Sequence, residues 1–425
     1  MRSFSWVKKM TNTDIKWFSF DNTNAPQFTN TWGCMIDVLD ACLVMGFGSQ
    51  VISSLIVENG IGIATFGSAH NFKQFQVIEI SGASDSKLNT EFKIIGLSAN
   101  TIEFVIDATD QTAVGTISCK VAPLGWIKVF SGENKAVYRA KDTEANPFYL
   151  RVDNSLDPVY NANYAKFAKV GILEGCSHID DFGANQVPYD SGNPNKNWIG
   201  IGSGTSAING WAKWYHAVSE SAPSFQIKET ALPENDKKEW TVIGDESSFY
   251  LVSTPVSQSN NNKNIAAYTY GFGVTEKKNF RVPFLLAHQQ NVSVSLSDFF
   301  FNSNPLRYGW APSTILMTNN IGLYSQDLTA YPQYYLPNKT TDETQMRSGS
   351  LSFSSPEPGI HFSKVMLHSS AHAFMGAFPM LYSMQSSHFQ YGDLHTFMED
   401  GECFVLKKVA QSNDIGAFVF KVGEL

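Results

Sequence analysis

The chain has 425 residues, of which 43% are hydrophobic and 16% are charged, and its formal net charge is −8. This composition is typical of a globular chain of two or three domains and excludes an intrinsically disordered one. The acidic balance argues against nucleic acid as a main partner, because nucleic-acid binding needs a basic surface. No apolar stretch reaches the about 18 residues of a membrane span, and the N-terminus lacks the apolar segment of a secretory signal.

The first elements in the chain are a strand and a helix. Residues Ile15–Phe20 alternate apolar and polar side chains, which predicts a strand. Over Trp32–Met45 the apolar side chains instead recur at near-helical spacing, and Gly46 and Gly48 follow as helix-ending residues. We therefore expect a helix at Trp32–Met45 and few others in the chain.

From Val51 to Pro123 the alternation has a period of two. Gly, Asn and Asp separate short segments rich in Ile, Val, Phe and Thr, namely LIVEN, IGIATF, FQVIEIS, TEFKIIGLS, TIEFVID and GTISCKV. Short strands at such close spacing predict a small barrel or sandwich.

The stretch Gly125–Arg139, GWIKVFSGENKAVYR, predicts a β-hairpin, because two β-type segments flank the turn-forming SGEN. A further strand is predicted in FYLRVDNS at 148–155, and Glu239–Val252 has the pattern of strand, tight turn and strand. Near the C-terminus FVLKKV and GAFVFKVG predict two more strands.

Together these segments predict a mainly β, multi-domain protein of short-stranded sandwich or barrel modules with one or few helices. We expect a discontinuous main domain at 1–57 and 123–297 and a small β-barrel module inserted at 58–122. The remaining residues, 298–425, are expected to form a β-rich C-terminal domain. A surface loop tolerates such an insertion because the ends of the inserted chain meet there.

Five cysteines are spaced too widely for a zinc knuckle and too irregularly for a disulfide framework: Cys34, Cys42, Cys119, Cys176 and Cys403. We expect them to be reduced and buried as small apolar side chains.

Three short motifs suggest chemistry, and each has a plainer interpretation. His368 and His372 have the spacing of two zinc ligands on a helix, but Ser369 stands where a zinc protease has its glutamate base. The HIDD motif at 178–181 suits either a bound cation or a plain Asx-type turn. The GIGSGTS segment at 200–206 lacks the lysine of a phosphate-binding loop and is typical of a flexible connection.

Four aromatic residues, Trp198, Trp211, Trp214 and Tyr215, form the one candidate ligand surface. Aromatic rings can stack on the CH faces of a sugar, so these side chains suit a glycan platform. The alternating pattern in WAKWY equally suits rings packed on a sheet face or in a subunit interface, and the sequence leaves both interpretations open.

Three segments, Trp32–Gly48, Gly125–Ser155 and Glu239–Leu251, resemble a family of virion structural proteins of tailed bacteriophages. The hairpin carries most of the resemblance. In that family the helix and its GFG turn often lead almost directly into the GW strand, which implies that the β-module is an insertion here. The resemblance implies assembly with other virion proteins and with further copies of the chain.

The inserted region, Ala64–Val121, is similar to a small β-module of phage proteins that is related to a half-domain of ubiquitin-activating enzymes. The matching wording is HNF at 70–72, the strand before SGA at 81–83, LN at 88–89 and TIEFVI at 101–106. This resemblance implies a fold only, because the catalytic cysteine of those enzymes lies outside the half-domain.

We therefore expect a non-enzymatic structural component of a virion, in the tail, baseplate or neck, with no catalytic residue, cofactor or metal. The alternative is a tail protein that binds a host-surface receptor or glycan through the inserted module or the 183–215 loops. A glycan depolymerase is a weaker third hypothesis, because the sequence places no pair of carboxylates on one surface.

Overall fold

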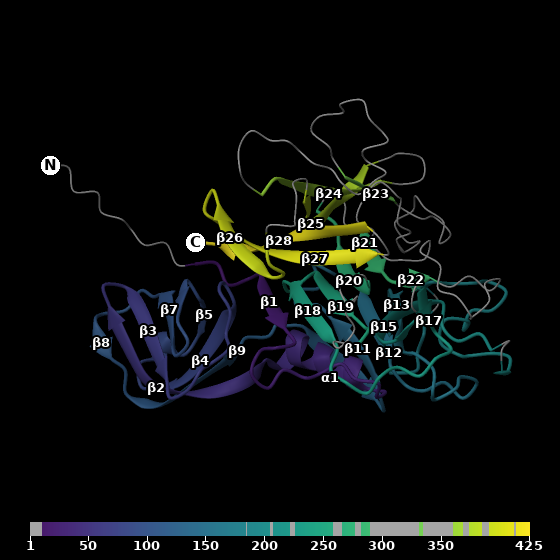
Figure 1. Cartoon of the computed structure of the whole chain (residues 1–425), viewed down its shortest axis with the longest axis horizontal. Helices are drawn as coiled ribbons and strands as arrows, with labels where there is room; N and C mark the ends of the chain where they lie inside the picture. The colour runs from purple at the N-terminus through teal and green to yellow at the C-terminus, as the bar shows by residue number, and fades with distance from the viewer. Residues whose placement is uncertain are drawn as a thin grey trace.

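A computed structural model gives the fold of the chain (Figure 1). The structure describes residues 11–183, 185–204, 207–221, 226–257, 266–276, 282–289, 331–334, 360–368, 374–384, 391–411 and 414–425. Much of the expected C-terminal domain and the candidate residue His372 lie outside these ranges.

The protein is mainly β, as the sequence predicted, and each strand pairing in the described ranges is antiparallel. Figure 1 shows one β-unit at the left end of the long axis and a larger β-body beside it, with the C-terminal strands above the body. A two-stranded ribbon, β16 (Ser219–Ser221) with β17 (Gln226–Lys228), accompanies three larger sheets.

The unit at the left is an eight-stranded sheet that curls toward a barrel. Along the sheet its strands are β5 (Glu91–Lys93), β4 (Val77–Ala83), β9 (Gly115–Val121), β2 (Phe47–Glu58), β3 (Ile61–Phe66), β7 (Thr101–Val105) and β6 (Gly96–Leu97), with β8 (Gln111–Thr112) beside β2 and a short 3-10 turn, η2, at Ser86–Leu88. Asn59 and Gly60 join β2 to β3 with φ of 51° and 73°, which is the two-residue turn that matches the strand twist. Phe92 stacks on Phe104 at 4.3 Å and brings β5 onto β7.

A seven-stranded sheet forms one layer of the body. Its strands are β10 (Ile127–Gly132), β11 (Lys135–Arg139), β12 (Tyr149–Asp153), β13 (Lys166–Leu173), β15 (Ala212–Ala217) and β22 (His288–Gln289), with β14 (Gln186–Val187) paired to β13. Strands β10 and β11 are the hairpin that the GWIKVFSGENKAVYR stretch predicted.

An eleven-stranded sheet packs on this layer and continues into the C-terminal strands. Its order is β1 (Lys16–Ser19), β18 (Glu239–Gly244), β19 (Phe249–Thr254), β20 (Ala266–Val274), β27 (Glu402–Gln411), β28 (Asp414–Glu424), β25 (Phe374–Met384), β24 (Phe362–His368) and β23 (Tyr331–Tyr334), with β21 (Pro283–Leu286) on β20 and β26 (His395–Glu399) on β27. Between the two layers Trp214 stacks on Tyr270 at 5.9 Å, and Trp126 meets Phe249 edge-on at 5.4 Å. Aromatic contacts of this kind, together with buried aliphatic side chains, form the core of the sandwich.

The helix predicted at Trp32–Met45 is present and begins at Cys34. It is α-helical as α1 (Cys34–Leu39) and continues as a π-helical segment, η1 (Asp40–Met45). Five of the six side chains of α1 are buried, all except that of Asp37, and Gly46 ends η1 with a φ of 69°. The apolar periodicity therefore located this element correctly.

The sheets to which β2 and β20 belong can be compared with the expected domain boundaries. Strand β2 begins at Phe47 and lies in the barrel sheet, although 1–57 was assigned to the main domain. Strand β20 pairs with β27, Ala266 opposite Gln411, so one sheet spans the expected boundary at 297. A single cluster of buried apolar residues also includes both barrel and body. The division into separately folding units stays a prediction.

All five cysteines are free, as predicted. Cys176 is half-buried, and the other four are buried: Cys34, Cys42, Cys119 and Cys403.

Candidate functional site

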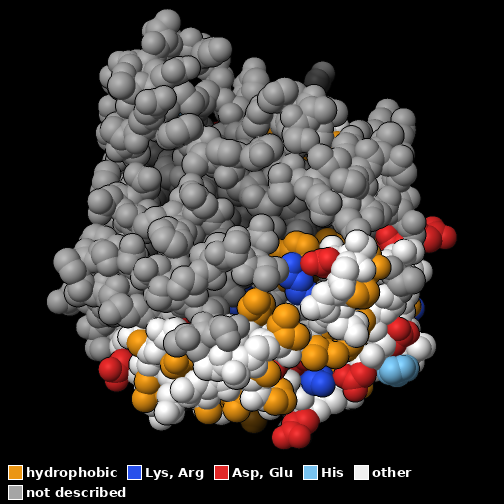
Figure 2. All heavy atoms as spheres, turned by 90° about the vertical axis from the view of Figure 1, so that its right-hand side faces the viewer, with side chains coloured by type: hydrophobic (Ala, Val, Ile, Leu, Met, Phe, Trp, Pro, Cys, Tyr) orange, Lys and Arg blue, Asp and Glu red, His pale blue; other side chains and the backbone are white. Residues whose placement is uncertain are grey.

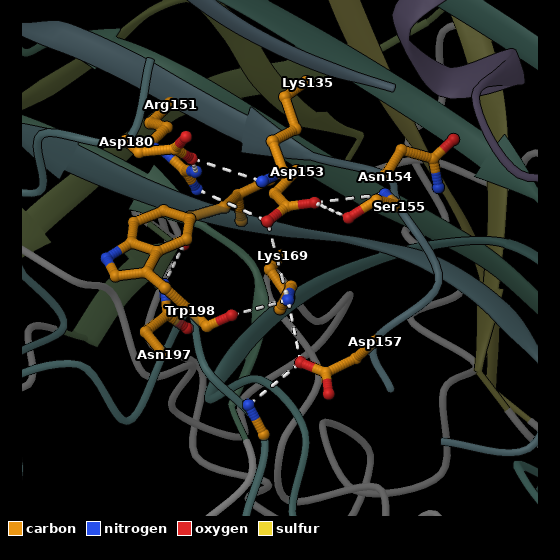
Figure 3. Close-up of polar contacts among 12 residues, drawn as sticks. Lys135, Arg151, Asp153, Asn154, Ser155, Asp157, Lys169, Asp180, Asn197 and Trp198 are labelled. Atoms are coloured by element: carbon orange, nitrogen blue, oxygen red, sulfur yellow. Dashed lines mark hydrogen bonds and ion pairs between the residues drawn. The ribbon is translucent and has the colours of Figure 1, made fainter. Parts of the chain in front are cut away.

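The seven-stranded sheet has a charged second face. On β12, Leu150 and Val152 point into the core, so the alternate residues Arg151 and Asp153 lie on the opposite face. Loops cover this face and bury its charges almost completely. The cluster, which we call the charge cluster, consists of three cations, Arg151, Lys169 and Lys213, and three carboxylates, Asp153, Asp157 and Glu229. Figure 3 shows four of them: Arg151, Asp153, Asp157 and Lys169.

Opposite charges alternate through the charge cluster. The Lys169 ammonium lies 3.1 Å from Asp157 and 3.5 Å from Asp153, and Arg151 lies 3.6 Å from Asp153 (Figure 3). Lys213 and Glu229 form a separate pair at 2.8 Å, with side-chain exposures of 0% and 1%. Because each buried charge has an opposite neighbour, the cluster avoids the large desolvation cost of an isolated ion.

The pKa shifts follow from burial and from these partners. Burial alone would raise the pKa of Asp153, but Lys169, the Ser155 hydroxyl and Arg151 together hold it below its usual value. Burial lowers the pKa of Arg151 and of Lys213, although their carboxylate partners oppose the shift. These ions stabilise one another, and their charges serve the packing of the loops onto the sheet.

One loop is held to the sheet through Arg151. Its guanidinium lies 4.4 Å from the Trp198 ring centroid and 4.8 Å from that of Phe182. Opposite Arg151 in the sheet, β13 carries Gly171, where a Cβ would come within 2.6 Å of the Trp198 ring. The carbonyl of Trp198 also accepts a hydrogen bond from Lys169 at 2.6 Å. Gly171, Arg151 and Lys169 therefore form the binding position of the Trp198 side chain and backbone, which we call the Trp198 site.

The aromatic residues proposed from the sequence as a glycan platform do not form one. Trp214 and Tyr215 are fully buried in the core, and Trp198 is 3% exposed beneath its loop. Only Trp211 is partly exposed, with Lys196 over its ring at 4.5 Å. Of the two interpretations that the sequence left open, burial favours packing: Trp214 lies between the two sheets and Tyr215 on the loop-covered face, because both faces of β15 are covered.

The other candidate motifs have structural roles in the described part of the chain. Asp181 accepts hydrogen bonds from the backbone of Ser177 and Gly183, as an Asx-type turn does. Asp180 pairs with Lys135 at 3.2 Å. Within the described ranges, no three His, Cys, Asp or Glu side chains gather as metal ligands.

In the parts of them that the structure describes, the glycine-rich segment and the histidine pair also lack the architecture of their motifs. The backbone of Gly200 donates to Asp157 at 2.9 Å, and Ile201 forms a β-bridge with Ile208. His368 is the last residue of strand β24 rather than part of a helix.

A buried Cys–His–Asn constellation was missed in the sequence. Cys34 Sγ lies 3.3 Å from His216 Nδ1, and Asn154 Nδ2 lies 3.0 Å from His216 Nε2. These residues come from α1, β15 and the end of β12, and no local spacing relates them. The same three residue types form the catalytic site of some cysteine proteases, so the protonation of His216 decides their chemistry.

The hydrogen bonds of Asn154 fix the histidine tautomer. Its Oδ1 accepts from the backbone N–H groups of Gly33 and Met35, so its Nδ2 faces the other way and donates to the Phe167 carbonyl. The same Nδ2 donates to His216 Nε2, which is therefore unprotonated. The proton of the neutral ring must lie on Nδ1, beside the thiol.

A nitrogen that already carries a proton cannot take one from Cys34. Burial raises the pKa of the Cys34 thiol to about 12 and lowers the pKa of His216 to about 3, so neither an activated thiolate nor an imidazolium forms near neutral pH. In this conformation the constellation links α1 to the sheet and is not an activated nucleophile.

A third polar centre joins the helix to the hairpin. Asp40, in the π-helical η1, accepts from the Tyr138 hydroxyl at 2.8 Å and pairs with Lys128 at 2.5 Å. Trp126 Nε1 donates to the carbonyl of Asp245, in the turn between β18 and β19, at 2.8 Å. Through these contacts three segments that are distant in sequence form one hydrogen-bonded unit.

The described surface shows no concentration of one charge sign at the loop-bearing end of the body. Figure 2 shows this end, where acidic, basic and apolar side chains are interspersed across the coloured part. No helix in the described ranges is long and apolar enough to cross a membrane.

Comparison with known proteins shows no family. No family model matches the chain, and no curated protein matches it. Among solved structures, the phage phi92 endosialidase aligns with 90% of this chain and 52% of its own length, at 7% identity and a TM-score of 0.16. The chain thus spans about half of that structure, and an alignment at this TM-score establishes neither a shared fold nor a shared activity.

Proposed function

We propose that this protein is a structural component of a tailed-bacteriophage virion, located in the tail, baseplate or neck, and that it acts by protein–protein assembly. The observation that carries the proposal is the convergence of the three segments that resemble virion structural proteins. Asp40 belongs to the first segment, Tyr138 and Trp126 to the second, and Asp245 to the third, and side-chain hydrogen bonds join them.

The polar chemistry of the described body supports an architectural role. The charge cluster neutralises itself beneath the loops, and the buried Cys34–His216 pair carries its proton on the wrong nitrogen for base catalysis. Trp214 and Tyr215 lend no support to the alternative of glycan binding through stacked rings, because both are buried. Assembly needs only shaped surfaces held rigidly, which fixed buried contacts provide.

The test is the content of purified particles. Virions banded on a density gradient should contain this chain at a constant ratio to the major tail protein, measured by quantitative mass spectrometry. An abundant non-structural phage protein is the control and should fall to background. Separated heads and tails then locate the chain, which we expect in the tail fraction. A chain that washes away with the control would overturn the proposal.

A further inference from the structure

The sheets end in different ways. Strand β1 ends the eleven-stranded sheet with all four of its residues buried, and β5 of the barrel curls onto β7. Strand β10 ends the seven-stranded sheet and pairs only with β11 among the described residues. Its residues are exposed or half-exposed along the whole strand, with Ile127 at 37%. An edge of this kind offers unpaired backbone N–H and C=O groups to another strand.

The edge is also held in a fixed position. The backbone N–H of Trp126 donates to the Leu43 carbonyl at 2.9 Å just before β10 begins. Within the strand Lys128 pairs with Asp40, and the facing strand β11 is fixed to the same carboxylate by Tyr138. A strand ordered in advance loses little conformational entropy when a partner strand pairs with it.

One usual protection of an edge strand, a free lysine charge, is weakened at β10. A lysine on an edge normally presents its charge to an approaching strand, but the ammonium of Lys128 is directed to Asp40 at 2.5 Å. The register shifts between Lys128 and Phe130, so Val129 has no opposite residue in β11. This bulge leaves Val129 and Phe130 as a half-exposed apolar pair beside the open edge.

We propose that β10 pairs antiparallel with β10 of a second copy of this chain, so that the seven-stranded sheet continues across two copies. The strand sequence IKVFSG is compatible with itself. With Val129 opposite the partner subunit's Phe130, Lys128 lies opposite the partner subunit's Ser131. Apolar side chains then meet, and no like charges oppose one another. The inference deepens the proposed function, which requires repeated contacts between copies, and rests on it for the choice of partner.

Sedimentation velocity of the full chain across a concentration series tests this pairing. We expect reversible dimers whose dissociation constant rises at least about tenfold in Val129→Lys, because the new charge would be buried between strands. The matched control is Val51→Lys, at a 68% exposed position on β2 of the barrel, which should leave the constant within about twofold. Val129→Pro, at the bulge where proline is tolerated, is a second disruptive variant.

Hydrogen exchange gives an independent readout. Amides of Ile127–Gly132 should gain protection as concentration rises, and those of Phe47–Glu58 should not. A monomer at all concentrations, or a dimer that survives Val129→Lys and is weakened by Val51→Lys, would overturn the inference. Such a result leaves the virion role standing, because the particle content is measured separately.

Discussion

The barrel and the seven-stranded sheet bury their strands in different ways. Along β3 of the barrel, buried and half-exposed residues alternate, so one face packs inward and the other meets solvent. Along β13 and β15 every residue is buried, because the sandwich core covers one face and loops cover the other. Hydrophobic alternation is sufficient for the first arrangement. The second also requires that buried charges find partners, so its residues depend on one another more strongly.

The largest effect should come from breaking one pair of the charge cluster. Lys213→Met leaves the Glu229 carboxylate buried beside an apolar side chain, and we expect the free energy of unfolding to fall by about 3–5 kcal/mol. Urea unfolding followed by circular dichroism measures it. Lys135→Met is the control, because its partner Asp180 is 56% exposed, and it should cost about 1 kcal/mol or less.

A small loss in Lys213→Met would mean that water or a rearrangement satisfies Glu229, and that the covered face is more open than the structure indicates. Adding Glu229→Leu sharpens the result. Removing both charges should recover much of the lost stability, since the cost lies in a buried carboxylate that has lost its cation.

A second prediction concerns how stability depends on pH through His216, a buried residue of the seven-stranded sheet. The folded pKa of His216 is about 3, below the about 6.5 of an unfolded histidine, so between these values the unfolded chain binds a proton that the folded chain does not. The free energy of unfolding should therefore fall as pH decreases from about 6.5, with a contribution of about 1.4 kcal/mol per pH unit from this residue.

The His216→Gln variant isolates this contribution, because carboxylate titrations are common to both proteins and cancel in the difference. Its stability should depend less on pH between 6.5 and 4.5 than that of the wild type. Equal slopes for wild type and His216→Gln would show that the ring is accessible to protons.

The sequence predicted the arrangement of the barrel better than the chemistry of the covered sheet. Period-two segments and the Asn59-Gly60 turn are local signals, and so is the apolar spacing of the helix. The Lys213–Glu229 pair has no such signal, because its partners come from β15 and a loop. The sequence left open whether the aromatic residues of WAKWY lie on a surface or in the core, because alternation cannot tell a solvent-facing side of a strand from one covered by loops.

The smallest effect on the free energy of unfolding is expected from replacing a glycine by alanine, once in each region. In Gly171→Ala the new Cβ would lie 2.6 Å from the Trp198 ring and 2.9 Å from the Val187 carbonyl, so these neighbouring groups must move. Overpacking of this kind should lower the free energy of unfolding by about 1–3 kcal/mol. In the barrel, Gly67 has no atom within 4 Å of a new Cβ, and Gly67→Ala should change stability by about 0.5 kcal/mol or less. Chemical denaturation of the two variants side by side makes the measurement. Equal stabilities would show that the Trp198 ring can move away from Gly171 with no loss in the free energy of unfolding. The loop above the charge cluster would then not be fixed by the contacts described.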